Sequence, residues 1–150
     1  MIASSTTAQV PALSDAPTTL LTNVEQIVTL GTDFPAGRYV AQLQGVVIYI
    51  SAHSPRFYIQ AGDRGVQVNL QGSVASFRVG QQVEVRGEAQ GGLPEIRLVD
   101  AKANLLGDAP LPIPKRISPH NLAAGAEPFR FVSIRAAVRD MMCKDRKSVV

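Results

Sequence analysis

The stretch of residues 38–51 limits the folds open to this 150-residue chain more than any other segment. It begins with residues that alternate between two faces, from Val40 to Leu43, and then passes Gly45 into a continuous apolar run over residues 46–50. This pattern predicts one long β-strand that is half-buried at first, bends or bulges at the glycine, and is then buried on both faces. Such a strand can belong to both sheets of a small closed barrel.

Four shorter apolar runs follow and predict the remaining strands, at residues 56–60, 65–70, 82–88 and 95–103. Residues 71–77 separate the third strand from the fourth and predict a loop with one helical turn, whereas Gly91-Gly92 predicts a hairpin. A three-stranded meander, an interruption and then a hairpin are the pattern of an oligonucleotide/oligosaccharide-binding (OB) barrel. We therefore predict an all-β fold, a five-stranded OB-fold-like Greek-key barrel.

The N-terminal segments carry two different patterns. Residues 1–19 are rich in Ser, Thr, Ala and Pro and predict a disordered arm. Thr22-Asn-Val-Glu25 has the form of a capping box, and the apolar residues from Leu20 to Val28 fall at helical spacing before Gly31. A helix this short needs an apolar partner, so we expect it to cap one end of the barrel within a unit formed by residues 20–107.

Beyond the barrel, the four prolines of residues 108–119 predict an extended linker. Residues 120–144 are interpreted as the truncated start of a second, similar module, because residues 132–138 align without a gap with residues 41–47. We expect Phe129, Phe131 and Ile134 to be exposed, so that this segment frays or self-associates. Residues 145–150 resemble the translation of a sequencing-library adapter, and we interpret them as an artefact.

No group of residues predicts catalysis, a metal site or a cofactor site. A nucleophile, a base and an orienting acid do not occur at a recognisable spacing, and His53, His120 and Cys143 do not form a metal-ligand pattern. Gly62-Asp-Arg-Gly65 is a hairpin turn rather than a phosphate loop. No apolar run approaches the roughly 18 residues of a membrane span, so we expect a non-enzymatic chain without membrane contact.

OB barrels bind ligands on the face of their second and third strands. The outward residues expected there could hold a polar ligand; they are Tyr49, Arg56, Tyr58, Gln60, Arg64, Gln67 and Asn69. The formal net charge is only +3 and the basic residues are spread over every strand, which does not favour a phosphate-binding stripe. The expected partner is a small polar ligand, a glycan or a protein, with single-stranded nucleic acid and polysaccharide as alternatives.

Five short motifs follow one another in an order that resembles a bacterial family. They are Leu21-Thr-Asn-Val-Glu-Gln-Ile27, Gln44-Gly-Val-Val47, Phe57-Tyr-Ile-Gln60, Val79-Gly-Gln-Gln-Val-Glu-Val-Arg-Gly87 and Leu111-Pro-Ile-Pro114. The order is similar to that of the extracytoplasmic barrel modules, often in tandem, that precede the membrane segment of large sensor histidine kinases. This resemblance implies a periplasmic sensory module of a membrane-bound two-component sensor, and it assigns no ligand site.

Overall fold

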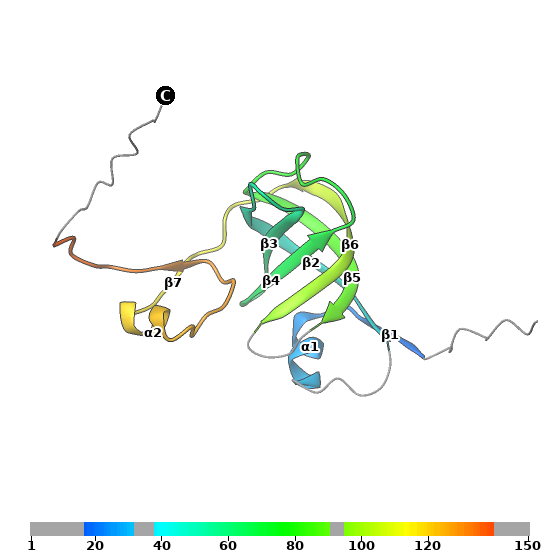
Figure 1. Cartoon of the computed structure of the whole chain (residues 1–150), viewed down its shortest axis with the longest axis horizontal. Helices are drawn as coiled ribbons and strands as arrows, with labels where there is room; N and C mark the ends of the chain where they lie inside the picture. Colours follow the sequence, from blue (N-terminus) through cyan, green and yellow to red (C-terminus); the bar gives the residue numbers. More distant parts are fainter. Residues whose placement is uncertain (1–16, 32–37, 91–94, 140–150) are drawn as a thin grey trace, which may run out of the picture.

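The computed structural model describes residues 17–31, 38–90 and 95–139 of the chain. Five strands close a barrel, as Figure 1 shows: β2 (Arg38–Ile50), β3 (Arg56–Ala61), β4 (Arg64–Leu70), β5 (Gln81–Gln90) and β6 (Ile96–Asp108). β2 pairs antiparallel with both β3 and β5, while β4 pairs antiparallel with β3 and parallel with β6. The antiparallel pair of β5 and β6 completes the closure. The predicted all-β, OB-fold-like barrel is therefore confirmed.

β2 is shared by the two halves of the barrel. Residues 40–46 pair with β5 and residues 46–50 pair with β3, so that the strand passes from one partner to the other at Val46. A Cβ on the preceding Gly45 would lie 2.6 Å from the carbonyl oxygen of Gln60, so the glycine permits a close approach of two backbones. The strand thus serves two partners, as its sequence pattern predicts.

Two details predicted for β2 are wrong. The irregularity in its pairing lies between Val47 and Tyr49, not at Gly45. The apolar run is also not buried on both faces, because Tyr49 is 57% exposed. Only the inner face of a barrel strand meets the core, so the outer residues of an apolar run depend on other segments for cover.

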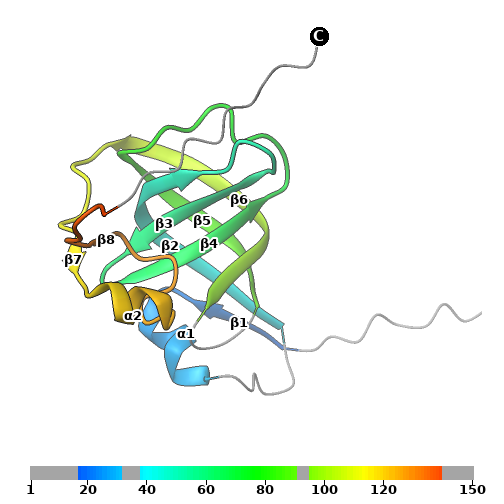
Figure 2. The same cartoon turned by 60° about the vertical axis from the view of Figure 1, so that its left-hand side comes forward.

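The core fills the barrel with the inward side chains of every barrel strand. The largest fully buried members are Phe57, Ile59, Val66, Val68, Val83, Val85, Ile96 and Leu98, together with Val47 and Ile27. Ile27 comes from α1 (Val24–Leu30), which lies across one end of the barrel in Figures 1 and 2. Val24 of α1 joins the same cluster, which confirms that the short helix packs its apolar side on the barrel.

The N-terminal helix begins later than its pattern predicts. Leu20 and Leu21 lie not in the helix but in β1 (Thr18–Leu21), which pairs parallel with the start of β2. The N-cap is Asn23, whose Oδ1 accepts a hydrogen bond from the Glu25 N–H at 2.9 Å, and Gln26 completes the capping box. β1 also includes two residues of the predicted arm, and residues 1–16 lie outside the described part of the chain.

Two other boundaries differ from the prediction. β6 runs on to Asp108 because its far end continues to pair with Gln81 and Gln82 of β5. The helical turn expected in residues 71–77 is a hydrogen-bonded turn, in which the Phe77 N–H donates to the Val74 carbonyl at 3.0 Å. The predicted Gly91-Gly92 hairpin lies outside the described residues.

A small second unit follows the barrel. It consists of β7 (Lys115–Arg116), α2 (Pro119–Ala123) and β8 (Val132–Ser133), and β7 pairs parallel with β8. The predicted linker is therefore interrupted by β7, and the alternation of residues 129–138 produces only the two-residue β8. Within the ranges described above, no helix is long and apolar enough to cross a membrane. Residues 140–150, including the predicted artefact, lie outside them.

Candidate functional site

The predicted ligand-binding residues lie on the outer surface of the barrel, mainly on β3 and β4. Tyr58 of β3 is paired with Gln67 of β4, and Arg56 is paired with Asn69. The Tyr49 ring, on β2, lies 5.7 Å from the Tyr58 ring between centroids. Five side chains of the predicted set therefore share one surface, which we name the platform: Tyr49, Tyr58, Gln60, Gln67 and Asn69. Arg56 lies at the start of β3, and Arg64 is exposed at the start of β4.

Residues 127–133, which we name the cover segment, lie against this platform. The Phe129 ring is 5.1 Å from the Tyr58 ring, and the Phe131 N–H donates a hydrogen bond of 3.2 Å to Oε1 of Gln60. In Figure 2 the chain between α2 and β8 crosses in front of the barrel at this place. Gln60 and Gln67 are only 7% and 6% exposed, although both belong to the outer surface. The chain itself therefore covers the part of the platform around Gln60 and Tyr58, while Tyr49 stays exposed.

Phe129 and Phe131 are consequently half-buried, not exposed as the sequence predicts. Their aromatic rings have a partner surface that the sequence pattern alone does not reveal. Ile134, beyond β8, is exposed as expected. Whether the segment frays or self-associates stays a prediction.

Ion pairs join the cover segment to β7 and to the β3–β4 turn. The side chain of Arg130 is 15% exposed and donates hydrogen bonds to Oδ1 of Asp63 at 3.0 Å and to Oε2 of Glu127 at 3.2 Å. Glu127 also accepts a hydrogen bond from the Lys115 ammonium in β7. The bond to Lys115, followed by that to Arg130, lowers the pKa of the Glu127 carboxyl against the opposing effect of burial. A continuous chain of charges thus joins β7, the cover segment and the β3–β4 turn.

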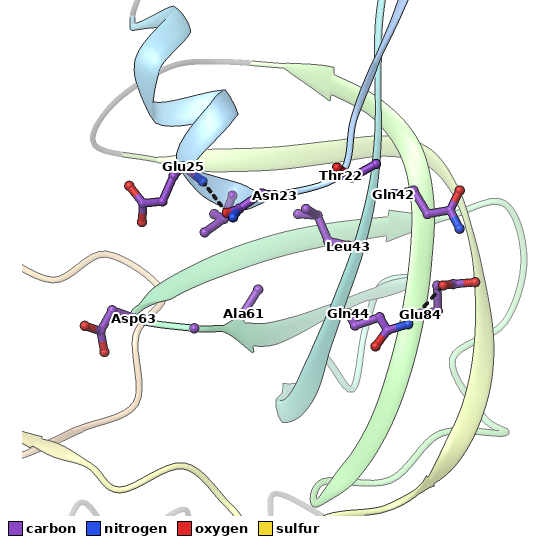
Figure 3. A pocket seen from close by; sticks show the side chains of 11 residues that line it. Thr22, Asn23, Glu25, Gln42, Leu43, Gln44, Ala61, Asp63 and Glu84 are labelled. Carbon is purple, nitrogen blue, oxygen red and sulfur yellow. Dashed lines mark hydrogen bonds between the residues drawn. The ribbon is translucent and has the colours of Figure 1, made fainter.

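A separate pocket of about 630 Å³ lies between α1 and the barrel wall. Its polar lining comes from three places: the start of α1, the neighbouring strands β2 and β5, and the β3–β4 turn. These polar residues are Thr22, Asn23, Glu25, Gln42, Gln44, Asp63 and Glu84. Figure 3 shows Gln44 and Glu84 together on one side, with a 3.2 Å hydrogen bond between them, and Glu25 and Asp63 on the other.

The chemistry of this pocket is that of amides and carboxylates. Glu25, Asp63 and Glu84 contribute carboxylates, Gln42 and Gln44 contribute amides, and none of the described residues that line the pocket is a lysine or an arginine. Such a lining attracts neutral hydrogen-bonding molecules or cations and repels anions. In the described ranges, no three His, Cys, Asp or Glu side chains are placed to hold a metal ion.

The sequence did not identify this pocket, because its shape depends on where α1 rests. Alternation along β2 does place Gln42 and Gln44 on the outer face, and Gln44 pairs with Glu84 across the sheet. Asp63, however, belongs to a turn and Glu25 to a helix. Only the packing of α1 on the barrel brings these five side chains together around one pocket.

No protein-family model matches this chain, and no curated protein sequence matches it. The OB fold therefore rests on the strand topology of the chain itself. The order of the motifs resembles that of modules in sensor histidine kinases, and a relationship to that family stays a prediction.

Proposed function

We propose that this chain is a non-enzymatic binding module in the extracytoplasmic part of a membrane-bound signal-transduction protein, of the sensor histidine kinase kind. The observation that supports a binding role is the polar pocket beside α1. It has the size of a small-molecule site and stands on a closed, well-packed barrel that holds its lining in place. The periplasmic location and the parent protein rest on the order of the motifs.

The ligand we propose is a small polar molecule with several hydroxyl groups, and a sugar that carries an amine fits the lining best. The amides of Gln42 and Gln44 can each donate and accept hydrogen bonds, as sugar hydroxyls require. The carboxylates of Glu25, Asp63 and Glu84 accept hydrogen bonds and attract positive charge. A phosphorylated sugar would be repelled by the same carboxylates.

A ligand in this pocket would act on the rest of the chain through Asp63. This carboxylate lines the pocket and also accepts the hydrogen bond from Arg130 of the cover segment. A bound amine that attracts Asp63 competes with Arg130 and so weakens the hold on residues 127–133. The signal is then a change in how the second unit sits on the barrel.

Isothermal titration of the full chain with glucosamine, glucose and glucose 6-phosphate tests the ligand class. We expect saturable binding of glucosamine, weaker binding of glucose, and none of the phosphate ester. Gln44→Ala should weaken glucosamine binding by about tenfold, which is about 1.4 kcal/mol. Gln90→Ala is the matched control, since Gln90 is exposed at the end of β5 and does not line the pocket. Preference for the phosphate ester, or equal effects of both variants, would contradict the proposal.

Single-strand nucleic-acid binding is the alternative, and it needs a free platform with basic side chains along it. Here the cover segment lies on Tyr58, and Arg130 is engaged with two carboxylates. Fluorescence anisotropy with a labelled oligothymidine, at low and at high salt, separates the two functions. Micromolar binding that falls steeply with salt would replace the proposed function. Polysaccharide pull-down, lost in Tyr58→Ala, would instead support a carbohydrate-binding module.

A further inference from the structure

We infer that the platform is the docking surface for the next folded unit of this same chain, and that β7, α2 and β8 are the beginning of that unit. The inference goes beyond ligand binding at the α1 pocket, because it assigns the face that OB barrels commonly use for ligands to an intramolecular interface. It rests on a repeated structural arrangement, on a backbone contact that only glycine permits, and on buried polar contacts.

The second unit repeats the way in which the barrel begins. β1, α1 and β2 form a strand, a capped helix and a second strand parallel to the first, and β7, α2 and β8 follow the same order with the same parallel pairing. In both cases the N-cap comes two positions after the last residue of the first strand, Asn23 after Leu21 and Ser118 after Arg116. Each N-cap side chain accepts a hydrogen bond from the first turn of its helix. This repetition supports a second copy of the module.

Where the two units touch, the backbone of the cover segment lies so close to the barrel that only a residue without a side chain fits between them. A Cβ on Gly65 of β4 would lie 2.0 Å from the carbonyl oxygen of Phe129 and 2.1 Å from its carbonyl carbon. Gly65 itself is paired with Gln60, so it lies at the end of the platform next to the β3–β4 turn. Phe129 has φ of 58°, a left-handed conformation that bulky residues rarely adopt. This backbone conformation is strained, so the contacts around Phe129 must offset its cost in free energy.

Polar contacts near Gly65 also join the two units. Both ends of the buried Gln60 amide are used, because Oε1 accepts from the Phe131 N–H and Nε2 donates to the Gly62 carbonyl at 3.1 Å. The Arg130 side chain is 15% exposed and pairs with Glu127 of its own segment and with Asp63 of the β3–β4 turn, whose side chain is 85% exposed. The pair with Asp63 is therefore the ionic contact between the cover segment and the barrel. The occupant of the platform is thus the unit that begins at Lys115, in the same polypeptide.

Hydrogen exchange of backbone amides in the full chain tests this assignment. We expect the Phe131 amide and residues 115–133 to be protected in the unaltered protein. Gly65→Ala should speed their exchange at least tenfold and leave β2 and β5 protected, since the added methyl group meets the cover segment. Arg130→Gln, at a position outside the barrel strands, should have the same effect because it removes the ion pair with Asp63, while Arg135→Gln, at an exposed position just beyond the cover segment, should not.

Three results would overturn the inference: unprotected residues 115–133 in the unaltered chain, equal exchange in Arg130→Gln and Arg135→Gln, and protection that rises with protein concentration. The last would place the cover segment of a second copy on the platform. Measurement at two protein concentrations separates this case from docking within one chain. Glucosamine binding to the α1 pocket is measured independently, so failure of one proposal is distinguishable from failure of the other.

Discussion

Replacement of Ile27 by alanine tests whether α1 belongs to the cooperative core of the barrel. α1 has 7 residues, which is too short for a stable helix in water, so it depends on burying Val24 and Ile27. Ile27 is 1% exposed, and truncation of a buried isoleucine to alanine costs about 2–5 kcal/mol. The site lies at the end of the barrel beside a pocket, where neighbours can partly relax, so we expect a loss of about 3 kcal/mol in the free energy of unfolding.

Urea unfolding followed by circular dichroism measures this loss. With a slope of about 2 kcal/mol per molar urea, the midpoint should fall by about 1.5 M. Thr29→Ala is the control on the same helix, because Thr29 is exposed and should change the stability by less than about 0.5 kcal/mol. If both variants unfold at the same urea concentration, α1 opens independently of the barrel, and the reasoning that joins it to the core is refuted.

Two further predictions concern the barrel closure and the cover segment. Gly45→Ala places a Cβ 2.6 Å from the Gln60 carbonyl oxygen, and we expect it to lower the free energy of unfolding by about 1–3 kcal/mol; an unchanged urea midpoint would speak against this. Glu127 has a lowered pKa in the folded protein, so its stabilising effect is complete above the unfolded value and is lost as the pH falls through the lowered one. Protection factors of residues 115–133 should therefore fall below about pH 4, and Glu127→Gln should give lower protection that depends less steeply on pH in this range, since Asp63 still holds Arg130.

The barrel could be predicted because the residue pattern that indicates a strand lies within the strand itself. Strands such as β5 show their inward face by alternation, as with Val83 and Val85 between polar neighbours. β1 could not be recognised in this way. Leu20 and Leu21 fit a helical pattern as well as a strand, and their pairing with Val40 and Ala41 decides the outcome. That pairing depends on the folded barrel rather than on the segment itself.

The candidate site was predictable only in part, for a related reason. Outward residues of β3 and β4, such as Tyr58 and Gln67, follow directly from the strand pattern. What lies over them does not, because the ion pair of Asp63 with Arg130 joins residues far apart in the sequence. The same holds for the α1 pocket, where Glu25 and Glu84 come to line one cavity only after the helix has packed. Contacts of this kind are properties of the tertiary structure.

Gly65 has a consequence for anyone who compares this barrel with others of its kind. Glycine has no side chain that could bind a partner, yet Gly65 lies where a neighbouring backbone packs directly against the strand. Any barrel that carries a larger residue at the equivalent place must leave that surface bare or cover it differently. A glycine at this place therefore permits, in this chain, the close approach of the neighbouring unit to the side of the barrel.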